Sequence, residues 1–107
     1  MALARFRTGS HSLEIEAGRH KNINIEDRLC KYCGLNNNAI VIEDEYHVLF
    51  HCAAYNDVRD MYINRELTSL PNSHSFVSIM KSTNTQEIIN LAHFVCSMFK
   101  IRKKNNL

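Results

Sequence analysis

The sequence of 107 residues predicts a single, mostly α-helical domain. The chain holds only three glycines and one proline, which is too little turn punctuation for a multi-stranded sheet. Apolar residues recur at helical spacing through the second half of the chain. Three of the four cysteines and two of the six histidines fall within residues 29–52. This clustering predicts a compact knot near the front of a helical domain.

Three parts follow one another along the chain, and we expect them to form one domain. In the first part, Leu13, Ile15 and Ala17 alternate with polar residues as in a strand, whereas the polar residues before them suit a helix start. We expect a helix within Leu3–His20. The parts are a basic N-terminal segment (1–28), a cysteine-bearing knuckle and helix (29–53) and a helical tail (54–107), which together make up the single domain 1–107.

The middle part is expected to pass from a loop into one helix. Residues 35–39, Leu-Asn-Asn-Asn-Ala, have the composition of a loop, and residues 39–42 form a short β-like run. Residues 43–52 then show helical spacing. Their three leading acids suit the positive end of a helix dipole, and we expect these acids to be solvated.

The tail is expected to hold two helices joined by a short segment. A helix over 55–69 ends at the sequence Ser-Leu-Pro-Asn, and Asn84 with Glu87 forms a cap pair for a last helix over 85–102. Cys96 lies among apolar residues of that helix, which predicts a buried position. The inward face of the last helix is predicted to carry Ile88, Leu91, Ala92, Val95 and Phe99.

The clustered cysteines have the spacing of metal ligands. Cys30 and Cys33 have the two-residue gap that lets both sulfurs bind one tetrahedral ion. Gly34 follows directly, and we expect it to take the positive φ of a sharp knuckle turn. Thirteen residues separate Cys33 from His47, and four separate His47 from Cys52. Because two such pairs a dozen residues apart are typical of zinc sites, the predicted ligands are Cys30, Cys33, His47 and Cys52.

His51 is the rival for the fourth ligand position. On a helix it lies four residues after His47 and therefore shares the face of His47 more closely than Cys52 does. Cys52 reaches the metal only if the helix ends at that point, and the following Cys-Ala-Ala-Tyr-Asn run is a candidate break. We favour Cys52 because thiolate is the better zinc ligand.

Four protein ligands leave no position for water or substrate, so this set predicts one structural Zn²⁺ and no enzymatic role. The expected fold class is therefore mostly α: a small zinc-stapled domain in which a Cys knuckle and a short β-like segment pack on three to four helices. A redox Cys-x-x-Cys pair is disfavoured because no strand–motif–helix pattern surrounds it. A chance grouping of buried cysteines is the other alternative.

Charge and hydropathy indicate where in the cell the protein is expected and which part of it would meet a charged partner. No apolar run has the length of a membrane span, and the N-terminus lacks the hydrophobic stretch of a signal peptide. We expect an intracellular protein, in the nucleus or the cytoplasm, where clustered cysteines bind metals before they form disulfides. The formal net charge of +2 is weak, but basic residues gather at both ends of the chain and acids in the middle. A polyanion is therefore expected to meet the ends first.

Four stretches of the chain resemble the C-terminal zinc-binding (CCHC-type) region of reverse transcriptases from animal non-LTR retrotransposons. They are RFRTGSHSLEIEAGRH (5–20), RLCKYCG (28–34), IEDEYHVLFHCAAYNDVR (42–59) and FVSIMKSTNTQEIINLAHFVCSMFKIRKK (76–104). The resemblance implies the same four zinc ligands, an acidic lead-in at 43–45 and a trailing pair, Tyr55 and Arg59. The chain has Ala53 where family members often have proline. The resemblance also implies a detached tail that helps the rest of a reverse transcriptase polypeptide hold its RNA or target DNA.

Two functions are therefore expected. The first is a non-catalytic, structural zinc-binding domain that contacts nucleic acid, RNA or DNA, through basic side chains on phosphates. The alternative is a zinc-stapled protein–protein interaction module without nucleic-acid binding, which the low net charge and acidic centre favour. Basic residues sharing one face would favour the first function, and scattered ones the second. The expected phosphate-contacting residues are Arg5, Arg7, Arg19, Lys21, Lys100, Arg102, Lys103 and Lys104.

Overall fold

The structure, a computed structural model, describes residues 2–8, 11, 13–69 and 71–105. Most of these residues are helical, which confirms the predicted class. The helices are α1 (Ala2–Thr8), α2 (Glu14–His20), α3 (Lys31–Asn37), α4 (Glu45–Phe50), α5 (Asn56–Tyr62), α6 (Arg65–Ser69), α7 (Ser73–Met80) and α8 (Thr85–Lys104), with one-turn 3-10 helices η1 (Ile25–Asp27) and η2 (Ala53–Tyr55).

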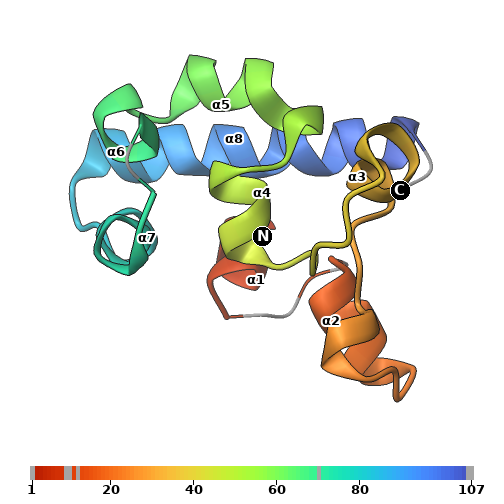
Figure 1. Ribbon diagram of the computed structural model, residues 1–107. Coiled ribbons are helices and arrows are strands. Elements are labelled where there is room, and N and C mark those ends of the chain that lie inside the picture. The colour runs from red at the N-terminus through yellow and green to blue at the C-terminus, as the bar shows by residue number, and fades with distance from the viewer. Residues whose placement is uncertain (1, 9–10, 12, 70, 106–107) are drawn as a thin grey trace.

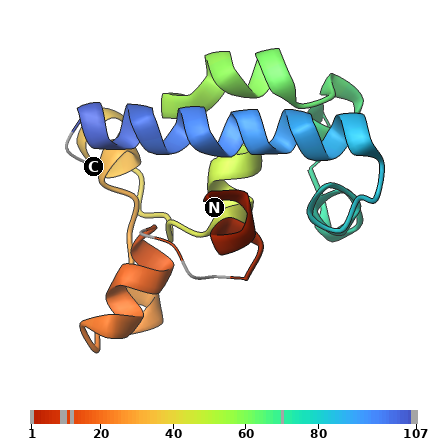
Figure 2. The ribbon, with the colours of Figure 1, turned by 180° about the vertical axis from the view of Figure 1, so that it is seen from behind.

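Helix α8 is the longest element and runs across the whole molecule (Figures 1 and 2). Helix α5 lies along one side of α8, and α1 packs against it from another side. Helix α2 projects away from the rest of the fold, on the side where α8 ends (Figure 1). The cysteine-bearing segment lies between α2 and the C-terminal end of α8.

The core lies between α8 and the helices that cross it. Side chains from α1, α4 and α8 meet there with Leu13 and Tyr55. Burial of this apolar surface is the main force that holds the short helices on α8. The fully or almost fully buried members are Phe6, Leu13, Val48, Leu49, Tyr55, Leu91, Phe94, Val95 and Met98.

The expected β-like segment over 39–42 is not a strand. In the part of the chain that the structure describes, the only β pairing is an isolated antiparallel bridge between Leu29 and Ile42. Two backbone hydrogen bonds flank it: Cys30 donates to the Val41 carbonyl over 2.8 Å, and Glu43 donates to the Arg28 carbonyl over 2.9 Å. The pairing ends there because the chain enters α3 on one side and approaches α4 on the other.

The predicted helix over 55–69 is interrupted. Helix α5 ends at Tyr62, and Ile63 is extended at φ −106° and ψ 135°. Only 6% of Ile63 is exposed, so the break turns an apolar side chain into the core before α6 begins. The predicted cap of the last helix is confirmed, since the Asn84 side chain accepts from the Glu87 N–H over 3.0 Å.

Cys96 was expected in the core, and the structure places it on the surface. The buried positions of α8 include Leu91, Val95 and Met98. A helix turns by about 100° per residue, so the residue directly after Val95 leaves the buried face. The apolar neighbours of Cys96 in sequence therefore say little about its own side chain.

Glu43 joins three separate parts of the fold. It is 0% exposed, and its two carboxylate oxygens accept from Arg102 Nη1 over 3.0 Å and Nη2 over 2.9 Å. The same carboxylate accepts from the Glu14 N–H over 2.8 Å, and the Glu43 carbonyl accepts from the Ile15 N–H over 2.9 Å. Glu43 thus caps α2, whose N-cap residue Leu13 offers no side-chain acceptor.

This arrangement corrects the expectation of three solvated acids on the first helical turn. Helix α4 begins only at Glu45, and Asp44 is its N-cap, accepting from the His47 N–H over 2.8 Å. Glu43 precedes the helix and is buried, which is tolerated because Arg102 and the Glu14 N–H satisfy its carboxylate. Burial raises the pKa of Glu43, and the Arg102 charge acts in the opposite direction.

Replacing Glu43 by glutamine is expected to lower the free energy of unfolding by about 3 kcal/mol, because it leaves the Arg102 cation buried without its counter-charge. Urea denaturation followed by circular dichroism measures this. Glu26→Gln, at an exposed position of η1, is the matched control and should change stability by less than about 0.5 kcal/mol. Equal stability of the two variants would contradict a structural role for the pair.

Candidate metal centre

The four predicted ligands come from two short helices and the residues beside them. Cys30 is the N-cap residue of α3 and Cys33 lies in its first turn, while His47 lies in α4 and Cys52 just beyond it. The Gly34 N–H donates to the Cys30 carbonyl over 3.1 Å, which closes the knuckle around the first pair.

Gly34 does not take the predicted positive φ. It lies inside α3, and a Cβ at its position would meet only the Ala39 carbonyl oxygen at 4.0 Å. The left-handed turn comes four residues later at Asn38, with φ 52°. Asparagine tolerates this conformation well. The knuckle is therefore a short helix closed by an asparagine, and its turn does not depend on glycine.

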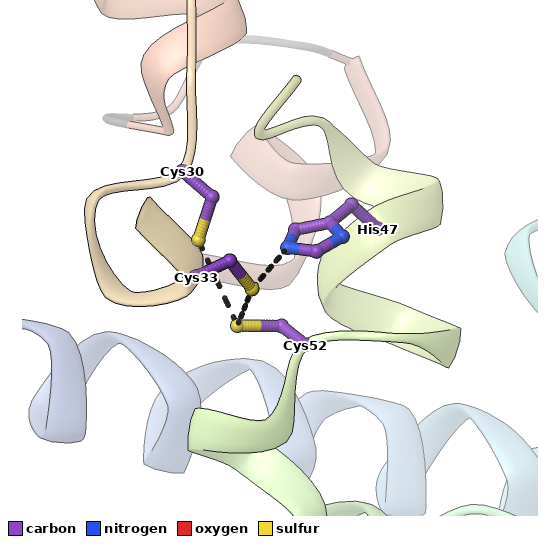
Figure 3. Close-up of side chains that lie close together, drawn as sticks. All are labelled: Cys30, Cys33, His47 and Cys52. Atoms are coloured by element: carbon purple, nitrogen blue, oxygen red, sulfur yellow. Dashed lines mark hydrogen bonds between the residues drawn. The ribbon is translucent and has the colours of Figure 1, made fainter. Parts of the chain in front are cut away.

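The four ligand atoms meet in one buried cluster (Figure 3). All of them lie within 4.8 Å of one another. Cys30 Sγ and Cys52 Sγ are 3.8 Å apart, and Cys33 Sγ and Cys52 Sγ are 3.9 Å apart. Cys33 Sγ lies 3.4 Å from His47 Nε2.

These distances match the edges of a tetrahedron around one zinc ion. Zinc binds thiolate at about 2.3 Å and imidazole at about 2.0–2.1 Å, which places two sulfurs about 3.8 Å apart and a sulfur and a nitrogen about 3.6 Å apart. A disulfide needs about 2.05 Å between sulfurs, and the cysteines are free thiols. The donor set therefore fits a tetrahedral metal ion.

The structure brings Cys52 into the cluster and leaves His51 outside it. Helix α4 ends at Phe50, and Cys52 is extended at φ −66° and ψ 120°. The N–H groups of His51 and Cys52 both donate to the His47 carbonyl, over 2.8 and 2.9 Å. The exposed His51 ring packs on Tyr46, with centroids 5.5 Å apart. The helix thus ends where Cys52 needs it to end, although Ala53 replaces the proline of the resembling sequences.

Arg59 holds the end of α4 in place. Its Nε donates to the Leu49 carbonyl over 2.8 Å, and its Nη2 donates to the carbonyls of Val48 over 2.8 Å and Cys52 over 2.9 Å. These carbonyls belong to the last turn of α4 or follow it, where a helix leaves acceptors unpaired. Arg59, named at first only as part of a trailing pair, therefore positions the backbone of Cys52.

Burial and mutual contact shift the thiol pKa values. The hydrogen bond from the Cys52 thiol lowers the pKa of Cys30 to about 3, and the same contact raises the pKa of Cys52 far above its ordinary value. Burial raises the pKa of Cys33. A divalent cation bound in the cluster would stabilise all three sulfurs as thiolates.

His11 contacts the first residue of α4, a contact that the ligand-spacing rules do not predict. Only 1% of its side chain is exposed, and its Nε2 lies 2.9 Å from Glu45 Oε1. Its Nδ1 accepts from the Leu13 N–H over 3.3 Å. His11 thereby links the N-terminal segment to the first residue of α4. The only sequence signal was its place in the stretch that carries the family resemblance.

The basic residues expected to contact phosphate fall into different environments. Arg102 is 4% exposed and is engaged by Glu43, so it is a structural residue that a phosphate does not reach. Arg7 is half-buried, with its Nη2 3.5 Å from the Ser82 carbonyl, and Arg19 pairs with Glu16 over 2.7 Å. The exposed members are Arg5, Arg19, Lys21, Lys100, Lys103 and Lys104.

These basic residues do not form one patch. They lie on α1, on the outer end of the projecting α2 and on the C-terminal end of α8, which are separate places in the fold (Figures 1 and 2). The densest group is at the C-terminal end of α8, where Lys100, Lys103 and Lys104 are exposed.

No family model matches this chain, and no curated protein or solved structure is significantly similar to it. Among the described residues, no helix combines the length and apolar character that crossing a membrane requires.

Metal retention should decide between Cys52 and His51 as the fourth ligand. Cys52→Ser removes one tetrahedral ligand and should abolish stoichiometric binding of a divalent ion, whereas His51→Ala should leave binding within about twofold of wild type. Elemental analysis of dialysed protein measures both. Loss of metal in His51→Ala with retention in Cys52→Ser would reverse the ligand assignment.

Proposed function

We propose that the protein is a non-catalytic domain built around one structural Zn²⁺ bound by Cys30, Cys33, His47 and Cys52. The observation that carries the proposal is the agreement between the sulfur–sulfur and sulfur–nitrogen distances and the edges of a zinc tetrahedron. Thiolate and imidazole donors select zinc over the hard cations that prefer oxygen ligands.

Burial of the cluster supports a structural role for the metal. The exposed fractions are 2% for Cys30, 5% for Cys33, 7% for His47 and 0% for Cys52. A four-coordinate site closed in this way has no position for a substrate. The ion would join α3 to the end of α4, and in a domain of this size such a link supplies a large share of the folding free energy.

We further propose that the domain contacts nucleic acid through the end of α8. The support is the exposed group of Lys100, Lys103 and Lys104 at the C-terminal end of the helix. Lysines of this kind bind phosphates without reading sequence. In this proposal, the chain is the tail of a retrotransposon reverse transcriptase, as the motif resemblance implies, and works with the rest of that polypeptide inside the cell.

The alternative, a protein–protein interaction module, is favoured by two apolar side chains beside the knuckle. Leu35 in α3 and Ile40 just after it are each 83% exposed. The spread of the basic residues over α1, α2 and α8 also favours this alternative, as the sequence analysis anticipated.

Removal of the metal should unfold the domain. We expect one zinc per chain, and a strong chelator should convert the helical circular dichroism signal to that of a largely unfolded chain, restored by added Zn²⁺. A chain that is metal-free as purified and fully folded in chelator would end the structural-zinc proposal.

Affinity for nucleic acid should depend on salt. Three phosphate contacts predict that affinity falls by roughly 20-fold for single strands and roughly 40-fold for duplex between about 50 and about 200 mM salt. Fluorescence anisotropy with labelled RNA and DNA measures this. The triple variant Lys100→Gln, Lys103→Gln, Lys104→Gln should lose most of the binding. Undetectable or salt-independent binding of the wild type would instead favour the interaction module.

A further inference from the structure

Arg59 is a buried cation whose hydrogen-bond partners are neutral. It is 5% exposed, and its guanidinium donates to the carbonyls of Val48, Leu49 and Cys52 and to Asn56 Oδ1, the last over 2.7 Å. None of these four acceptors carries a charge. A buried cation without a nearby anion is costly, because carbonyl dipoles replace only part of the water it has lost.

The other buried charges of the described residues do not balance Arg59. Glu43 and Arg102 form a two-point ion pair. Glu14 lies 3.6 Å from both Arg102 and Lys31, so these four charges cancel one another. The nearest acid on the helix of Arg59 is Asp60, which is exposed and therefore screened by solvent. One positive charge is left over in the core.

The metal cluster supplies a matching negative charge. A divalent ion with three thiolates and a neutral imidazole carries a net charge of −1, whereas a Cys2His2 centre is neutral. The Cys52 carbonyl receives a 2.9 Å hydrogen bond from Arg59 Nη2. Burial lowers the pKa of Arg59, and the neighbouring Cys52 sulfur acts in the opposite direction. The unbalanced positive charge of Arg59 and the negative charge of the metal centre therefore lie next to each other at Cys52.

We propose that Arg59 is the counter-charge of the metal centre and favours its three-thiolate, metal-bound form. This inference rests on the proposed zinc site. It makes Arg59 a positioning residue with two separable actions: its hydrogen bonds fix the Cys52 backbone, and its charge stabilises the bound ion. A neutral side chain loses both actions, and lysine keeps the charge while it loses most of the hydrogen bonds.

The test compares Arg59→Gln with Arg59→Lys by metal titration, using Co²⁺ as a spectroscopic probe and Zn²⁺ by competition. Arg59→Gln should weaken affinity for both ions by about 10-fold to 100-fold, in the range of other outer-sphere substitutions. Arg59→Lys should recover about tenfold of that loss. Arg65→Gln, which removes an exposed arginine from α6, is the matched control and should leave affinity within about twofold of wild type.

Equal losses in the lysine and glutamine variants would overturn the counter-charge, because hydrogen bonds alone would then account for Arg59. If a variant is unfolded without metal, circular dichroism during the titration reports coupled folding and binding. The ratio of the metal affinities of Arg59→Lys and Arg59→Gln then still tests the counter-charge. A wild-type protein that binds neither ion would overturn the zinc site itself, an outcome distinct from equal losses in the two variants.

Discussion

The meeting of three sulfurs and one imidazole in a single buried space is the constraint on which the fold depends. Helices α3 and α4 have only seven and six residues, and helices of this length are not stable alone in water. The cluster ties the N-terminal end of α3 to the C-terminal end of α4, with Cys30 and Cys52 in contact across a separation of 22 residues. The remaining elements pack around this link.

Besides the small apolar core, buried charged side chains hold the helices together. Glu43 joins α2 to the end of α8, Glu45 meets His11, and Arg59 closes the end of α4. Glu43 is paired with an opposite charge and Glu45 with an imidazole, so burying them is tolerated. Arg59 donates to backbone carbonyls, and in our proposal the metal centre supplies its counter-charge. These links fix how the short helices are oriented relative to one another, because hydrogen bonds and ion pairs are directional and apolar contacts are not.

Local pattern predicted the elements that depend on neighbouring residues. The last helix and its Asn84 cap follow from helical periodicity and a capping pair, and both are seen. Pattern failed where the partner is distant: Arg102 was assigned to phosphates, but its partner Glu43 is 59 residues away in sequence. Cys96 was expected in the core and is exposed for the same reason, since periodicity does not say which face another element will cover. The buried contact between His11 and Glu45 likewise leaves no signal in the local pattern.

By itself, the sequence determined that a Cys-x-x-Cys pair and a later histidine and cysteine have zinc-ligand spacing, because that spacing is a local property of the chain. Only the tertiary structure decided the fourth ligand. Helix α4 ends at Phe50, and Arg59 holds its last carbonyls, so Cys52 turns toward the other sulfurs while His51 turns outward. That choice depends on contacts between residues of different helices, and these exist only once the chain has packed.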